Sequence, residues 1–307
     1  MNSSMHSKPP RYSKLLPCLS IQASWQRLVD LFTDAGIDCA RQEASIVLQH
    51  VTRQTPTDFF ANLQRTLLPA ENSQVEAIVS RRLLREPLQY ILNSAHFYGR
   101  EFYVDSRVLI PRPETELLIE LVREILPVLP QRAAGPTFAD VGTGSGSVAV
   151  TLACEIAGAR ILAIDSSKAA LQVARINAAR HSVGDRVHLL QDDLLTAVGA
   201  RYSVIVANLP YVPTKDIQGL SPEVSCFEPH HALDGGADGL DAITRLCSQA
   251  AQVLDTNGWL LLEVGEGQAD GVLQLLSQQH MWEPLRSVPD LRGVSRVVAG
   301  RMVGSHR

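Results

Sequence analysis

The run Asn208-Leu209-Pro210-Tyr211 follows the apolar segment 202–207 and carries the groups needed to hold a planar NH2 group. The Asn208 side-chain carbonyl and the main-chain carbonyl of Leu209 are acceptors, and each can take one hydrogen of such an amine. Proline fixes its own φ angle and restricts the residue before it, so Pro210 directs the Leu209 carbonyl. Tyr211 can stack on a flat acceptor group. Taken alone, the four residues also fit an ordinary proline turn at the end of a strand.

A glycine-rich loop follows the apolar segment 137–141 and precedes a helical pattern. It consists of Gly142, Thr143, Gly144, Ser145 and Gly146. Alternate glycines let the backbone turn sharply and approach a ligand closely. The spacing GxGxG differs from the GxGxxG of dinucleotide sites, and no lysine follows as in a GxxxxGK phosphate loop, so NAD and ATP are disfavoured. Asp165 ends the next predicted strand, where a carboxylate can accept hydrogen bonds from both hydroxyls of a ribose.

Further polar residues stand at the ends of predicted strands. Ligands in open parallel sheets bind beyond the carboxyl ends of the strands, so we expect these residues to share one ligand with the glycine loop and Asn208. We place Asp193 at the adenine amino group, although Asp192 could take this role while the other aspartate caps a helix. Asp140 either bonds the backbone of the loop or touches the ligand.

From Thr137 onward, apolar segments alternate with helical patterns, which predicts an α/β fold with a mostly parallel sheet covered on both faces. The predicted strands are 137–141, 160–165, 186–191, 202–207 and 259–264. The predicted helices are 148–157, 168–181 and a long one that ends near Leu254. The segment 282–303 is rich in β-forming residues and predicts an antiparallel pair at the sheet edge.

The first third of the chain has a different pattern, in which apolar residues recur every three or four positions from Trp25 to about Arg85. We therefore divide the chain into four parts. These are a flexible tail (1–20), a helical domain for substrate recognition (21–90), a connecting β-hairpin (91–112) and the sheet domain (113–307). Pro113 and the glutamates after it suit the first turn of a helix that starts near Arg112.

Composition limits the possible functions. The 307 residues are 45% hydrophobic and 20% charged, which is enough for two cores, and the net charge of −4 predicts no basic face for stable nucleic-acid binding. Five scattered cysteines without a CxxC pair favour a reducing compartment and no metal site. No apolar run approaches the roughly 18 residues of a membrane span, so we expect a cytoplasmic protein. The tail resembles an organelle transit peptide only weakly.

Several motifs occur in an order that resembles one family, the S-adenosylmethionine-dependent methyltransferases that modify a glutamine of peptide-chain release factors. The resemblance runs from Trp25 to Arg301. Its motifs are IPRPETELL (110–118), DVGTGSG (140–146), NLPY (208–211), EPHHALDGGADGL (228–240), LLEVGEGQ (261–268) and GVSRVVAGR (293–301). The chain departs from the usual pattern at Leu209, where the family has proline, and at Ser295, where aspartate is common.

The resemblance implies a Rossmann-like methyltransferase sheet with an antiparallel edge, plus a small helical N-terminal domain. It implies that S-adenosyl-L-methionine is held by the glycine loop, Asp165, Asp193, Leu194 and Asn208. Asn208 to Tyr211 would hold the glutamine of the Gly-Gly-Gln loop of a class-1 release factor, the expected partner. The RPETE run would border the cofactor or the peptide entrance, although helix capping also explains it. A ribosomal-protein glutamine, a nucleic-acid base and a non-catalytic cofactor-binding module remain alternatives.

Overall fold

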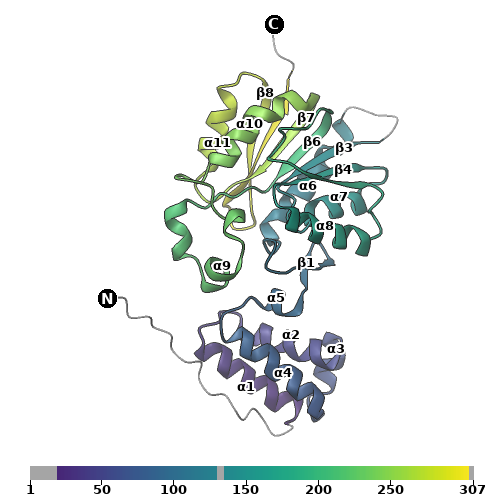
Figure 1. Cartoon of the computed structure of the whole chain (residues 1–307), viewed down its shortest axis with the longest axis vertical. Helices are drawn as coiled ribbons and strands as arrows, with labels where there is room; N and C mark the ends of the chain where they lie inside the picture. The colour runs from purple at the N-terminus through teal and green to yellow at the C-terminus, as the bar shows by residue number, and fades with distance from the viewer. Residues whose placement is uncertain (1–18, 130–134, 304–307) are drawn as a thin grey trace. The chain divides into compact units, whose positions relative to one another are not determined.

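A computed structural model describes residues 19–129 and 135–303 of the chain and divides it into two compact units (Figure 1). The first unit runs to Ile91 and the second begins at Leu92. Most of the predicted tail, 1–20, lies outside the described residues. Within the described ranges, no helix combines the length and the apolar character that a membrane crossing requires.

The first unit is helical, as the spacing of its apolar residues predicts. Its helices are α1 (Ile21–Asp34), α2 (Ala40–Thr52), α3 (Pro56–Ala61), α4 (Pro69–Arg82) and α5 (Leu88–Leu92), the last of which ends one residue into the second unit. Ser20 caps α1 by accepting a hydrogen bond from the Ala23 N–H. Arg82 of α4 is 3% exposed and pairs with Glu43 of α2 at 2.6 Å, so an ion pair and apolar side chains together hold this unit.

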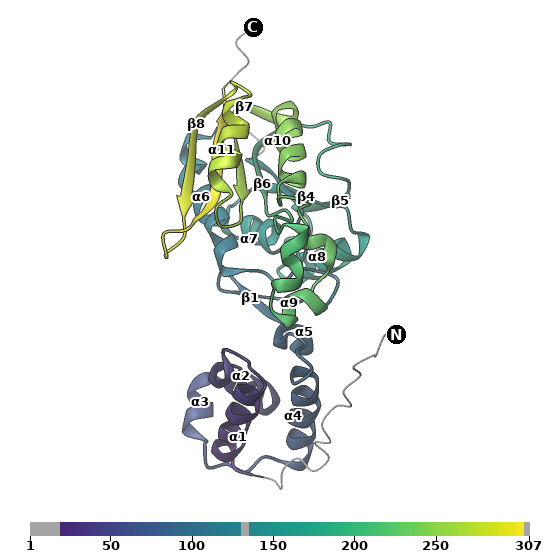
Figure 2. The same cartoon turned by 90° about the vertical axis from the view of Figure 1, so that its left-hand side faces the viewer.

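The second unit is built on a seven-stranded sheet with the order β5-β4-β3-β6-β7-β9-β8. Figure 2 shows β8 on one side of this unit and β5 on the other. The strands are β3 (Thr137–Val141), β4 (Arg160–Asp165), β5 (Val187–Gln191), β6 (Tyr202–Ala207), β7 (Leu254–Glu263), β8 (Trp282–Pro289) and β9 (Ser295–Met302). The first five pair in parallel, whereas β9 is antiparallel to both β7 and β8. The predicted parallel sheet with an antiparallel edge is therefore confirmed.

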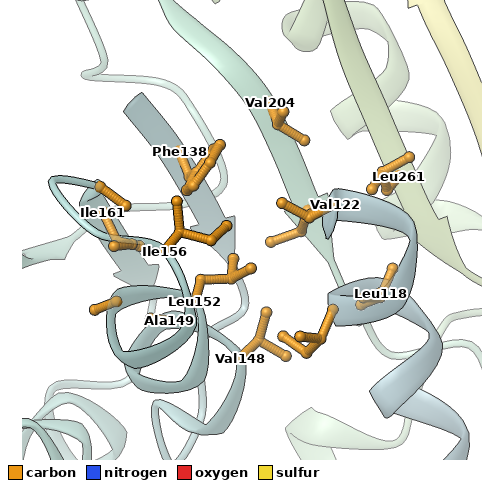
Figure 3. Packing of buried hydrophobic residues seen from close by; sticks show 14 of the residues in the cluster. Leu118, Val122, Phe138, Val148, Ala149, Leu152, Ile156, Ile161, Val204 and Leu261 are labelled. Carbon is orange, nitrogen blue, oxygen red and sulfur yellow. The ribbon is translucent and has the colours of Figure 1, made fainter. Parts of the chain in front are cut away.

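Apolar side chains alternate between the two faces of the sheet, and each face packs against its own helices. Phe138 belongs to a cluster with residues of α6 (Glu116–Ile125) and α7 (Ser147–Glu155) (Figure 3). Helix α8 (Lys168–Arg180) also contributes to this cluster. The next residue, Ala139, belongs to the cluster with α10 (Asp241–Val253) and α11 (Ala269–Ser277). Both faces are covered, which explains why the strands are almost continuously apolar.

Two predicted elements are shorter than expected. The long helix predicted to end near Leu254 is α10, which ends at Val253 as expected but begins only at Asp241. The preceding segment forms α9 (Pro222–Phe227) and the short 3-10 helices η3 (Thr214–Gly219) and η4 (His230–Ala232), since its prolines and glycines interrupt a regular helix. The predicted hairpin is present, but β1 (Ala95–Phe97) and β2 (Arg100–Phe102) have only three residues each.

The strand register brings distant residues to one level at the carboxyl edge of the sheet. Val141 of β3 lies beside Ile164 of β4 and Ala207 of β6, and Ala207 lies beside Leu262 of β7. The residues that follow these four are therefore neighbours: Gly142, Asp165, Asn208 and Glu263. The chain order reverses between β3 and β6, and such a switch point is where open α/β sheets bind ligands.

Asn177 connects three parts of the second unit. Its side chain is fully buried on α8, where Oδ1 accepts a hydrogen bond from the Tyr103 N–H at 2.7 Å. Its Nδ2 donates to the carbonyls of Tyr103 at 2.9 Å and of Ser145 at 2.8 Å. The segment after β2 and the glycine loop are thus tied to the same helix, and loss of this amide would leave buried backbone groups unpaired.

We expect Asn177→Ala to lower the free energy of unfolding by about 3 kcal/mol, because buried donors and acceptors that lose their partners cost about 1–3 kcal/mol each. Urea unfolding monitored by circular dichroism measures the change. The control is Arg175→Ala, which truncates an exposed side chain on the same helix. Equal stability of the two variants would contradict the bridging role.

Candidate active site

A cavity of about 440 Å³ lies beyond the carboxyl ends of β3, β4, β5 and β6, a volume typical of small-molecule sites. Most of the residues that the sequence predicts for the site line it. They are Gly142, Thr143, Gly144, Ser145, Asp165, Asp193, Leu194, Asn208, Leu209 and Pro210. Gly146 and Tyr211 are not among the lining residues. Side chains from four strand ends therefore converge on one cavity.

The glycine loop fits closely between its neighbours. Gly142 has φ +77°, and a Cβ at this position would stand 3.0 Å from Leu209 Cδ2 and 3.2 Å from the Asn208 carbonyl oxygen. Glycine is needed here both for its backbone conformation and for the close approach of the two loops. Gly146 has another role, because a Cβ there would stand 3.1 Å from the Ala174 Cβ on α8. It allows α7 and α8 to pack.

Asp140 supports the loop from below. Its carboxylate is 2% exposed and accepts hydrogen bonds from the Thr143 hydroxyl at 2.6 Å and from the Ala149 N–H at 3.1 Å. Burial raises the pKa of Asp140 to about 7, although both hydrogen bonds oppose the rise. Asp140 therefore holds the loop through the Thr143 side chain and not through the loop backbone, and it also lines the cavity, so a ligand contact stays a prediction.

Asp165 lies at the wall of the cavity with its carboxylate already oriented. Oδ2 accepts from the Gly144 N–H at 2.9 Å, and Oδ1 accepts from the Ser167 N–H at 2.8 Å. Burial raises the pKa of Asp165, whereas these hydrogen bonds lower it. Each carboxylate oxygen can accept a second hydrogen bond, so both hydroxyls of a ribose could be held. The glycine cradle and this carboxylate therefore fit the nucleoside part of the expected cofactor.

The two aspartates after β5 differ in what they contact. Asp192 caps the turn that follows, since its carboxylate accepts from the Asp193 N–H at 2.9 Å and from the Ala197 N–H at 2.7 Å. Asp193 is exposed and pairs with Arg245 of α10 at 2.5 Å. Leu194 is 8% exposed and adds an apolar wall. Asp192 thus caps the turn and Asp193 is held by Arg245, while both aspartates line the cavity, so the adenine contact of Asp193 stays a prediction.

The Asn208 side chain is held at one end only. Its Nδ2 donates to the Thr115 hydroxyl oxygen at 3.0 Å. Within the described part of the chain, neither Asn208 Oδ1 nor the Leu209 carbonyl accepts a hydrogen bond from another residue. The Leu209 side chain is 4% exposed and belongs to the core beneath the loop. The two acceptors that the sequence predicts for an NH2 group are therefore available at the cavity.

Tyr211 does not line the cavity, and it anchors the loop through hydrogen bonds at both its side chain and its main chain. Its hydroxyl donates to Glu263 Oε1 at 3.3 Å, and its carbonyl accepts from Gln268 Nε2 at 2.9 Å. Burial and the neighbouring Glu263 both raise the pKa of Tyr211. Glu263 is itself 1% exposed, and burial raises its pKa to about 7. In this arrangement Tyr211 ties the loop to the end of β7.

Sequence reasoning gave Thr115 no role beyond that of the RPETE run, and it assigned none to Glu228 or Glu263. Thr115 and Arg112 of the RPETE run line the cavity, and Arg112 pairs with Glu228 at 2.5 Å. The second Glu228 oxygen accepts from the Ile110 N–H at 3.1 Å. The run therefore borders the cavity and is also fastened to the segment 228–240. In the sequence, the only indication of these roles is that the residues lie inside motifs that resemble those of the release-factor methyltransferases.

Comparisons with known proteins agree along nearly the whole chain. Residues 24–92 match the PrmC N-terminal domain, and residues 116–220 match the methyltransferase small domain. A release factor glutamine methyltransferase of Geobacter sulfurreducens is 38% identical, over 88% of this chain and 92% of its own length. A release factor glutamine methyltransferase of Koribacter versatilis is 40% identical over 85% of this chain and 91% of its own length. A third, of Bradyrhizobium diazoefficiens, is 35% identical over 95% of this chain and 98% of its own length.

A solved structure supports the fold independently. The hMettl16 catalytic domain, crystallised with the MAT2A 3'UTR hairpin 6, superposes with a TM-score of 0.56 over 84% of this chain and 93% of that one. Its sequence is only 16% identical, so the likeness concerns the fold alone.

The raised pKa of Asp140 predicts a change of stability with pH. The folded protein keeps a proton that the unfolded chain has released, so this stabilising contribution is present below about pH 4 and is lost as the pH rises through about 7. Asp140→Asn lacks this contribution. Its free energy of unfolding should therefore fall less steeply than that of wild type between pH 5 and 7, with a difference in slope of at most ~1.4 kcal/mol per pH unit. Urea unfolding at pH 5, 6 and 7 measures both slopes, and equal slopes would overturn the prediction.

Proposed function

The chain belongs to the release factor glutamine methyltransferase family, and we propose that it methylates the side-chain amide nitrogen of the glutamine in the Gly-Gly-Gln loop of a class-1 release factor. As a member of this family it is a methyltransferase that depends on S-adenosylmethionine. The observation that carries the proposal is the pair of unoccupied acceptors, Asn208 Oδ1 and the Leu209 carbonyl, beside a cavity lined by the glycine loop and Asp165. They match the two hydrogens of a primary amide.

The residues around the cavity divide into two groups by chemistry. The glycine loop, Asp165, Asp193 and Leu194 would hold the cofactor, and Asn208 stands where the cofactor and the acceptor would meet. S-adenosylmethionine supplies a methyl group on a positively charged sulfur. The contribution of the chain is therefore to place an amide nitrogen in line with that methyl group and to exclude competing acceptors.

An amide nitrogen is a weak nucleophile because its lone pair is delocalised into its carbonyl. Hydrogen bonds from the two N–H groups to Asn208 Oδ1 and to the Leu209 carbonyl would strengthen as positive charge develops on the nitrogen, so they stabilise the transition state more than the ground state. Alignment of the reacting atoms can contribute several kcal/mol, of the order of 7 or more. The nitrogen then loses one proton to water after methyl transfer, and no strong general base is needed.

The helical unit has a proposed role of its own. We propose that residues 21–90 recognise the protein substrate, because a small acceptor molecule would not require a separate domain, and that residues 91–112 connect them to the catalytic part. The match of residues 24–92 to the PrmC N-terminal domain supports this division. A release factor acts on the ribosome, so the proposed substrate implies a cytoplasmic enzyme.

The direct test is transfer of labelled methyl from S-adenosylmethionine to a purified class-1 release factor. We expect label on the wild-type factor and none when its Gly-Gly-Gln glutamine is replaced by alanine. Equal label on both factors would place the methyl elsewhere. No label on either, with cofactor binding verified by calorimetry, would favour a ribosomal-protein glutamine, a nucleic-acid base or a non-catalytic module.

We expect Asn208→Ala to lower kcat by roughly 100-fold or more, because removal of one preorganised hydrogen-bonding group at a reacting centre typically costs 10²–10³. The Kd for S-adenosylmethionine, measured by calorimetry, should change only a few-fold, since the glycine loop and Asp165 remain. Circular dichroism serves as the folding control. Turnover within a few-fold of wild type would remove Asn208 from the mechanism.

A further inference from the structure

Two buried polar residues lie directly behind Asn208. Thr115, in the 3-10 turn η1 (Pro113–Thr115), is 3% exposed, and Glu263 at the end of β7 is 1% exposed. The register of β6 and β7 pairs Ala207 with Leu262, which places Asn208 beside Glu263. The Thr115 hydroxyl accepts from Asn208 Nδ2 at 3.0 Å, and the same side chain lies near the Glu263 carboxylate, whose pKa it lowers.

The direction of these hydrogen bonds is determined by chemistry. An amide nitrogen can only donate, so Thr115 Oγ1 must act as the acceptor toward Asn208, and its single hydrogen needs another acceptor. Glu263 can provide it. Its Oε1 accepts from the Tyr211 hydroxyl at 3.3 Å, and its buried Oε2 has no hydrogen-bond partner within 3.5 Å in the described part of the chain. The Thr115 hydroxyl is thus free to donate toward a carboxylate that needs donors.

The opposite arrangement would disable the site. If Thr115 donated its hydrogen to the Asn208 oxygen, the Asn208 NH2 group would face the cavity, where it would meet the NH2 group of an acceptor amide. Two donors would then oppose each other, and one of them would lose its partner. The orientation of one side-chain amide therefore decides whether the cavity accepts a primary amide.

We propose that Glu263, acting through the Thr115 hydroxyl, fixes the Asn208 side chain with Oδ1 toward the cavity. Glu263 and Thr115 are then positioning residues for methylation. This inference rests on the proposed function for the identity of the acceptor. It explains why a carboxylate is kept in the core, where its burial is costly. The charge of Glu114 raises the pKa of Glu263 and that of Arg296 lowers it, and neither residue forms an ion pair with Glu263 among the described residues.

The kinetic test compares variants that keep or remove the hydroxyl. Thr115→Val preserves shape but removes the hydroxyl, whereas Thr115→Ser retains it. We expect Thr115→Val and Glu263→Gln each to lower kcat roughly 10- to 100-fold, with the KM for S-adenosylmethionine changed less than about 3-fold, because only the orientation of Asn208 is lost. Thr115→Ser should stay near wild type. The double variant Thr115→Val with Glu263→Gln should be no slower than either single variant, since both break one chain of hydrogen bonds.

A second measurement does not depend on activity. The side-chain NH2 of Asn208 can be observed by 15N NMR and assigned from its loss in Asn208→Asp. Its hydrogens should exchange slowly with water in wild type and in Thr115→Ser, and at least 10-fold faster in Thr115→Val. The NMR decides the orientation even if wild type fails to methylate a release factor, an outcome that would overturn only the proposed function.

Two outcomes would overturn the positioning role. One is a Thr115→Val enzyme with wild-type kcat and an unchanged Asn208 NH2 resonance. The other is a Thr115→Ser enzyme as slow as Thr115→Val, because the volume of the threonine and not its hydroxyl would then matter.

Discussion

The backbone register of the parallel strands is the constraint on which the site depends. Hydrogen bonds between β3 and its two neighbours set Val141 beside Ile164 and Ala207, and the same ladder continues to Leu262. A shift of one residue in any of these strands would turn its last side chain to the opposite face of the sheet. The glycine loop, Asp165 and Asn208 can therefore share a cavity only in this register. The apolar clusters on both faces hold it in place.

Two buried carboxylates, Asp140 and Glu263, stand under the two loops of the cavity. Each has its pKa raised to about 7 by burial, so each reduces stability near neutral pH. Asp140 holds the glycine loop through Thr143, and Glu263 holds the 208–211 loop through Tyr211. Burial of a polar group costs free energy unless hydrogen bonds compensate for it. Here the hydrogen bonds of the two carboxylates hold loops that must present backbone atoms to ligands.

The two departures from the family pattern have structural accounts. With leucine at position 209 the main-chain carbonyl is still present, and the side chain is buried in the core. Leu209 Cδ2 lies so close to Gly142 that a Cβ on this glycine would be 3.0 Å from it. The leucine thus packs one loop against the other. At Ser295 no carboxylate precedes Arg296, but Asp290 supplies one at 3.2 Å and also binds the Arg292 and Val294 N–H groups. The arginine keeps an acidic partner from another position.

The sequence by itself determined the strands, because buried parallel strands are continuous apolar runs, and it determined that polar residues stand at their carboxyl ends. Strands β3, β4 and β6 coincide with the predicted segments 137–141, 160–165 and 202–207. Only the tertiary structure decided which aspartate caps a turn, that Tyr211 faces Glu263, and that Thr115 reaches Asn208 across 93 residues. The reason is physical: periodicity records which face of an element is buried, whereas the partner of a polar side chain depends on which distant segments pack together.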